Sequence, residues 1–136
     1  MKQDLIKLRL IEENLGDEEI LPFHYFDIVC AGITVGKISL RFGDNFHSYY
    51  NGHVGFEIFQ EYTGNNYAFQ ATLLILDVAK KHGMSRLYLT CKQSNMASKR
   101  IFEKLGADFI EVTKIPENCF FYWDGIEDYA IYRLKL

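Results

Sequence analysis

The chain has 136 residues, of which 49% are apolar and 24% are charged, and its formal net charge at pH 7 is −3. This length and composition are ordinary for a globular protein, so we predict one domain over residues 1–136 and not a disordered chain. Basic residues cluster only at positions 80–82 and 99–100. Because duplex binding requires a concentrated basic face, we expect no nucleic-acid partner.

No apolar stretch approaches the length of a membrane span, and the first residues lack the apolar centre of a signal peptide. We therefore expect no membrane partner. The three cysteines, Cys30, Cys91 and Cys119, are widely spaced, and the four histidines share no metal-ligating spacing. These patterns predict neither a disulfide framework nor a metal site, and the cysteines indicate a cytoplasmic protein in a reducing compartment.

The first half of the chain reads mainly as strands. Residues 5–10 alternate loosely and could form a strand, while the acidic residues 11–21 read as a short helix or a loop. Three runs rich in β-branched and aromatic residues follow, at 25–30, 34–41 and 53–59, separated by turns that contain Gly or Asn. Such runs and turns are typical of an antiparallel meander.

The second half mixes helices and strands. Between residues 65 and 82, apolar side chains recur every three or four positions, which predicts a helix that ends at Gly83. We then expect a strand at 86–91, a helix from Ser94 or Asn95 to Leu105, and strands at 109–115 and 129–134. A strand–helix–strand unit implies one parallel crossover, so the predicted class is α+β, with a mixed, mostly antiparallel sheet of about six to seven strands.

The junction Glu61-Tyr62-Thr63-Gly64-Asn65-Asn66-Tyr67-Ala68 is the most informative segment for chemistry. Gly and Asn tolerate positive φ and let a ligand approach the backbone. The first N–H groups of the following helix have no intrahelical partner, so this end attracts a phosphate. Composition alone favours an ordinary turn before a helix, and the surrounding sequence is needed to decide.

Two further segments supply that context: Gly52-His53-Val54-Gly55-Phe56-Glu57-Ile58, and Ser94-Asn95-Met96-Ala97-Ser98 continuing to Phe102-Glu103-Lys104-Leu105-Gly106-Ala107. With the junction, they resemble the GNAT family of acyl-CoA-dependent N-acetyltransferases. In that family a strand runs into an Arg/Gln-x-x-Gly-x-Gly/Ala turn, and an Asn-x-x-Ser helix ends in Tyr-Glu-x-x-Gly-Phe. The resemblance covers roughly residues 34–115 and implies the acyl-CoA N-acyltransferase fold, with helices on both faces of the sheet.

The resemblance implies a reaction and a set of cofactor contacts. An acetyl group would pass from acetyl-CoA to a primary amine of a small molecule or peptide by direct attack, with a backbone donor holding the oxyanion. The pyrophosphate would lie on the N–H groups of the turn. The pantetheine arm would lie where the preceding strand splays from residues 86–91. The cofactor residues so implied are Phe56, Ile58, Phe59, Gly64, Asn65, Asn66, Tyr67, Ala68, Asn95, Ser98 and Phe102.

Four positions depart from the family pattern, and one of them, Ala107 in place of the final aromatic of Gly-Phe, is expected to change packing only. Thr63 replaces the Arg or Gln of the turn, and Asn66 replaces its first glycine, where a side chain could crowd a phosphate. Phe102 replaces the tyrosine proposed to protonate the leaving thiolate, so Tyr67, Tyr88 or a water would take over that step. These changes leave two alternatives open: a non-catalytic acyl-CoA-binding or regulatory module with the same fold, and an interaction domain without a cofactor.

An acceptor that arrives as an ammonium must lose a proton, which a carboxylate or an imidazole could take. Glu57 and His53 are the candidates, since positions four apart in a strand share one face. The competing interpretations are a rim charge for Glu57 and a merely hydrogen-bonded ring for His53.

The acceptor side of the site is expected to be open. Only residues 11–22 are available for the segment that shapes it in the family, so a second subunit of a homodimer could complete it. The acidic residues there could favour a cationic acceptor or simply be solvated. The aromatic run at 120–123 could line the acceptor site, form a dimer contact or pack beneath a hairpin. The partners expected are acetyl-CoA and an amine.

Overall fold

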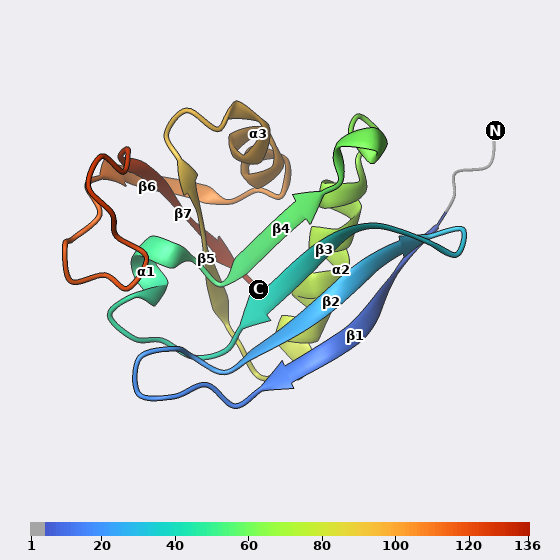
Figure 1. Cartoon of the computed structure of the whole chain (residues 1–136), viewed down its shortest axis with the longest axis horizontal. Helices are drawn as coiled ribbons and strands as arrows, with labels where there is room; N and C mark the ends of the chain where they lie inside the picture. Colours follow the sequence, from blue (N-terminus) through green and yellow to red (C-terminus); the bar gives the residue numbers. More distant parts are fainter. Residues whose placement is uncertain (1–4) are drawn as a thin grey trace.

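The computed structural model describes residues 5–136, and within them it contains seven strands and three α-helices (Figure 1). The elements in chain order are β1 (Ile6–Asn14), β2 (Phe23–Cys30), β3 (Ile33–Arg41), α1 (Ser48–Asn51), β4 (Val54–Ile58), a 3-10 turn (Gln60–Tyr62), α2 (Tyr67–Lys81), β5 (Arg86–Lys92), α3 (Met96–Lys104), β6 (Asp108–Thr113) and β7 (Tyr129–Lys135).

The strands form two antiparallel sheets, one in the order β1-β2-β3-β4 and the other in the order β5-β7-β6. The α+β class and the antiparallel pairing predicted from the sequence are confirmed. The sequence predicts one mixed sheet with a parallel crossover, whereas the structure divides the strands between two sheets. β4 and β5 start close together, run in the same general direction and diverge towards their C-terminal ends (Figure 1). The splaying of these two strands is therefore what separates the sheets.

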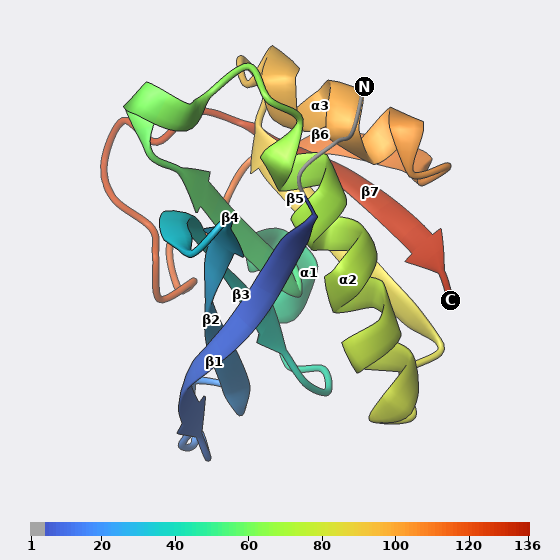
Figure 2. The same cartoon turned by 90° about the vertical axis from the view of Figure 1, so that its right-hand side faces the viewer.

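Helix α2 covers one face of the four-stranded sheet (Figure 2). Its buried residues include Ala71, Ile75 and Ala79, each 0% exposed, which repeat at the spacing of one helix face. They join a core with fully buried residues such as Ile28 and Leu40 from β2 and β3. The periodicity that predicts a helix over 65–82 is thus confirmed, with the helix beginning two residues later.

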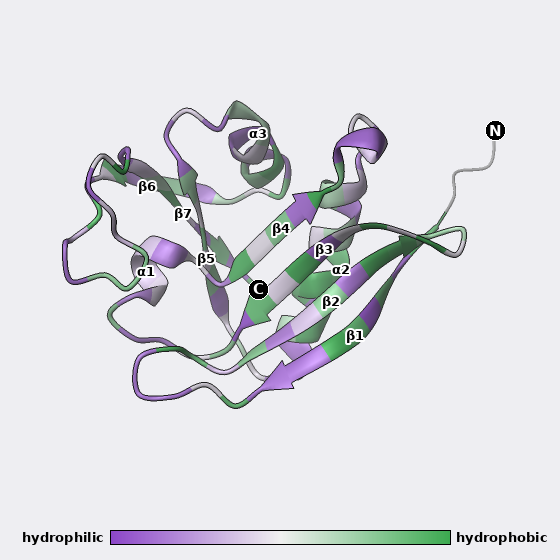
Figure 3. Ribbon diagram, in the orientation of Figure 1, coloured by the Kyte–Doolittle hydropathy of each residue, from purple (hydrophilic) through white to green (hydrophobic). Residues whose placement is uncertain are grey.

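The other face of the four-stranded sheet carries no helix. Arg9, Asp27, Lys37 and Glu57 occupy matching positions across all four strands and form one charged row. Arg9 donates to Asp27 at 2.7 Å and Lys37 does so at 3.3 Å. The hydrogen bond from Arg9 holds the pKa of Asp27 below its usual value. Apolar and polar residues alternate along β4 (Figure 3), and the charged row leaves this face of the sheet polar.

Helices lie on both faces of the three-stranded sheet. On one face, Phe102 of α3 packs edge-on against Tyr132 of β7, with their ring centroids 5.2 Å apart. On the other face, Thr90 of β5 donates to the Tyr50 carbonyl of α1 at 2.8 Å. Within residues 5–136 no helix is both long enough and apolar enough to cross a membrane.

One local prediction needs correction, and two short elements were not predicted. Residues 11–14 continue β1 and do not form a helix or a loop, because Glu12, Glu13 and Asn14 pair with β2 after a bulge. This end of an edge strand is largely exposed on both faces, so its sequence shows no alternation. α1 and the 3-10 turn have four and three residues, too few to produce a periodic pattern.

His53 joins the two sheets where β4 and β5 start. Its main-chain N–H donates to the Tyr88 carbonyl at 2.8 Å, and its ring Nδ1 accepts the Tyr88 N–H at 2.9 Å. Nε2 lies 2.8 Å from the Gly43 carbonyl, so the ring is neutral and carries its proton on Nε2. The preceding Gly52 has a φ of +76°, and a Cβ there would lie 3.2 Å from the Tyr88 carbonyl oxygen.

The His53 ring predicts a loss of stability in mild acid. The side chain is 0% exposed, and this burial lowers the pKa of His53 below its ordinary value. The unfolded chain therefore binds more protons than the folded one once the pH falls below about 6.5. We expect the contribution of His53 to the free energy of unfolding to decrease there by up to about 1.4 kcal/mol per pH unit.

Urea unfolding between pH 5 and 8 measures this effect, with His53→Gln and the exposed His82→Gln compared against the native chain. The native chain and His82→Gln should share the acid slope, and His53→Gln should reduce it. Equal slopes in all three proteins would contradict the assignment.

Candidate functional site

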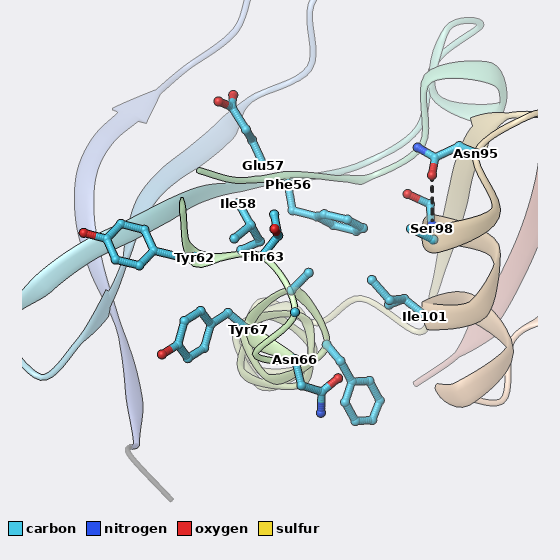
Figure 4. Close-up of a pocket in the computed structure, with 14 residues that line it drawn as sticks. Phe56, Glu57, Ile58, Tyr62, Thr63, Asn66, Tyr67, Asn95, Ser98 and Ile101 are labelled. Atoms are coloured by element: carbon cyan, nitrogen blue, oxygen red, sulfur yellow. Dashed lines mark hydrogen bonds between the residues drawn. The ribbon is translucent and has the colours of Figure 1, made fainter. Parts of the chain in front are cut away.

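A cavity of about 440 Å³ opens between β4, the start of α2 and α3 (Figure 4). β4 pairs with β3 along one edge. In the described part of the chain its other edge forms no ladder with β5, so main-chain groups on that edge can meet a ligand. The lining comes from β4, the turn, and the two helices: Phe56, Glu57, Ile58, Tyr62, Thr63, Gly64, Asn66, Tyr67, Ala68, Phe69, Asn95, Ala97, Ser98 and Ile101.

Hydrogen bonds from its own side chains to its main chain stabilise the turn before α2. Thr63 Oγ1 donates to the Gln60 carbonyl at 2.9 Å, and Asn65 Nδ2 donates to the Tyr62 carbonyl at 3.0 Å. Gly64 and Asn66 both have positive φ, at +87° and +66°. Asparagine tolerates this conformation better than most residues, which explains how Asn66 can stand here.

The start of α2 favours a negatively charged ligand. Among the described residues, no side chain caps the helix at Asn66, and its first turn has no acidic residue. The basic residues Lys80 and Lys81 lie at the opposite end. The positive end of the helix dipole therefore points at the cavity without a carboxylate to neutralise it.

Asn95 and Ser98 occupy the α3 wall of the cavity. Asn95 is the N-cap of α3, and its Oδ1 accepts the Ser98 N–H at 3.0 Å, as Figure 4 shows. The Asn-x-x-Ser spacing is thus a helix cap as well as a pair of residues on the cavity wall.

Most residues assigned to the cofactor from the sequence line this cavity, and three do not. Asn65 folds the turn, and Phe59 lies just beyond the end of β4, outside the lining. Phe102 is 2% exposed and packs in the core. The sequence assignment also misses five lining residues: Tyr62, Thr63, Phe69, Ala97 and Ile101. Ala97 and Ile101 share the spacing of core residues, so periodicity alone cannot separate the two roles.

A second, open hollow of about 210 Å³ lies on the face of β4 that carries no helix. It shares Phe56 and Glu57 with the first cavity. The carboxylate of Glu57 is exposed and points away from α2 (Figure 4). The remaining lining residues are Tyr25, Lys37, Ile38, Ser39 and Gly55.

His53 does not fit the acid–base role predicted for it. The ring is buried, both nitrogens have main-chain partners, and the residue lines neither hollow. Tyr88 packs against His53 and beneath the Arg86 guanidinium, and it also lies outside the cavity lining. The run at 120–123 contributes no residue to either hollow, and its Phe120 packs against His47. In residues 5–136, no group of three or more acidic, His or Cys side chains is placed to hold a metal ion.

Comparisons with known proteins agree with this geometry. Residues 8–108 match the family model described as an acetyltransferase (GNAT) domain. Among curated proteins, no sequence matches significantly. One similar solved structure is an acetyltransferase from Salmonella typhimurium, described as modifying the N-terminal serine of 50S ribosomal subunit protein L7/L12. It has 17% identity and a TM-score of 0.66, with 84% of this chain and 64% of that chain covered.

Two more structures share the fold. The microcin C7 self-immunity acetyltransferase MccE, in complex with acetyl-CoA and AMP, has 18% identity and a TM-score of 0.65, covering 84% of this chain and 61% of that one. A GNAT acetyltransferase from Bacillus anthracis has 24% identity and a TM-score of 0.62, covering 82% and 65%. The chain thus spans less than two thirds of the length of each of these three structures.

Proposed function

Because this chain belongs to the GNAT acetyltransferase family, we propose that it transfers the acetyl group of acetyl-CoA to a primary amine of a small molecule or peptide. The observation that carries the proposal is the cavity between the splayed strands, which joins an unpaired edge of β4 to the start of α2. The unpaired edge of β4 suits an extended chain with amide groups, and the start of α2 suits a phosphate.

The backbone of residues 64–68 is proposed to hold the pyrophosphate. Gly64 has no side chain and Ala68 has a small one, so both leave the backbone accessible to a phosphate. The helix dipole favours the negative charge. The pantetheine arm then lies between Phe56 and Ile58 on β4 and the α3 wall formed by Ser98 and Ile101. The main-chain groups of β4 are the donors and acceptors for its amides, and one of them would hold the oxyanion.

The amine is proposed to arrive through the hollow on the opposite side of β4. Glu57 is the carboxylate shared by the two hollows, so it can bind the ammonium or accept its proton. With Phe102 in the core, the leaving thiolate would be protonated by water or by a hydroxyl of the lining, such as that of Tyr67.

We place this activity in the cytoplasm, since Cys30, Cys91 and Cys119 are free and buried, which suits a reducing compartment. The homodimer expected from the sequence stays a prediction. The second candidate function is a module that binds acyl-CoA without transferring the acyl group. It is favoured by the burial of Phe102 and by the His53 ring, whose two nitrogens are both hydrogen-bonded, which leaves Glu57 as the one remaining candidate base of the two predicted.

Cofactor binding is tested by thermal unfolding with acetyl-CoA, with free CoA as a second ligand. A ligand present at about 100 times its Kd adds roughly 2.7 kcal/mol to the free energy of unfolding. For a domain of this size we expect the Tm to rise by about 5–15 °C. No rise at millimolar acetyl-CoA would contradict both candidate functions.

Replacement of Glu57 tests the transfer step. With an amine found by screening for thiol release, Glu57→Gln should lower kcat about 100-fold, because general base catalysis commonly contributes that much. The Tm shift with acetyl-CoA should be unchanged. The control is Glu61→Gln, an exposed carboxylate outside the cavity lining. An unchanged rate in Glu57→Gln would remove this residue from the mechanism, and binding without turnover across the amines would favour the second candidate.

A further inference from the structure

The cavity lining lacks a positive charge for a ligand that carries several negative ones. Glu57 is its one charged side chain, and it contains no lysine, arginine or histidine. The Thr63 hydroxyl is occupied by the Gln60 carbonyl. The start of a helix supplies only about half an elementary charge. The pyrophosphate and the additional phosphate of CoA therefore need a cation from outside the lining.

Lys104 is held at the edge of the cavity by two lining residues. Its Nζ lies 3.3 Å from Asn66 Oδ1 and 4.2 Å from the centre of the Phe69 ring. Asn66 precedes the first residue of α2, and Phe69 lies in its first turn. The ammonium is thus restrained beside the helix start by a hydrogen bond and a cation–π contact, although the side chain is otherwise long and flexible.

The position of Lys104 on α3 continues the wall of the cavity. Ala97 and Ile101 line the cavity, and Lys104 follows three residues after Ile101 on the same helix. Positions i, i+4 and i+7 lie on one face of a helix, so these three residues point the same way. The face spans about 10.5 Å from Ala97 to Lys104 at 1.5 Å per residue. One face of α3 therefore runs along the cavity and ends in a cation beside the start of α2.

We propose that Lys104 binds a phosphate group of acetyl-CoA and supplies the positive charge that the cavity lining lacks. This inference rests on the function proposed above. It also gives Asn66 a role: its side-chain oxygen faces the lysine and positions the ammonium. The crowding of a phosphate expected at Asn66 from the sequence is replaced by an indirect contact through Lys104.

The test is the affinity of the full chain for acetyl-CoA, measured by calorimetry at low salt. Lys104→Gln should raise the Kd about tenfold, because it removes a charge-assisted contact, while Lys104→Arg should stay within about twofold. The matched control is Lys80→Gln, an exposed lysine in the last turn of α2, which should not change the Kd. The effect of Lys104→Gln should shrink as salt rises, since screening weakens exposed charge pairs.

S-acetylpantetheine, which has no phosphate, distinguishes a phosphate contact from a general change in the cavity. Lys104→Gln should leave its affinity unchanged, and the salt series decides the question if that ligand binds too weakly to measure. The role of Lys104 would be overturned if Lys104→Gln lost the same affinity for both ligands, or if its Kd for acetyl-CoA equalled that of Lys80→Gln. The proposed function would still stand in either case. Failure of the native chain to bind acetyl-CoA would overturn both.

A second pair of variants tests the positioning by Asn66. Asn66→Gly keeps the positive φ of the turn but removes the oxygen that restrains Lys104. It should raise the Kd two- to threefold in the native chain and have no effect in the Lys104→Gln background. An equal effect in both backgrounds would show that Asn66 acts without Lys104.

Discussion

The arrangement of the molecule depends on one junction, where His53 and Tyr88 exchange hydrogen bonds between two sheets. A continuous ladder along β4 and β5 would merge the sheets and close the space between them. The contact is instead limited to the place where the strands start, and Gly52 lets the backbones approach there. The strands then diverge, and one edge of β4 is left to meet a ligand.

Helices α2 and α3 form the remaining walls of the cavity. α2 buries one face in the core and presents its positive end at the cavity, while one face of α3 runs along the opposite wall. The polar face of the four-stranded sheet carries no helix, so Glu57 lies between the cavity and an open hollow. The proposed reaction needs such an arrangement, because acetyl-CoA and the amine would reach the thioester from opposite sides of β4.

The sequence predicted the class, the helix periods and the turn, because each has a strong local pattern. It failed where the local pattern and the tertiary role differ. His53 shares strand parity with Glu57, yet the Gly43 carbonyl and Tyr88 enclose it. Residues 11–14 lie in an edge strand exposed on both faces, so they show no alternation. Lys104, in the last turn of a helix, looks like an ordinary surface charge, and only its distance to Asn66 reveals its position.

The central claim is that the splay between β4 and β5 forms the acetyl-CoA site. An NMR titration of the labelled protein with acetyl-CoA tests it most directly, since each backbone amide reports its own surroundings. We expect the largest shifts on residues 56–58, 64–69 and 95–101, with little change at 120–123. Saturable shifts centred elsewhere, or none at all, would contradict it.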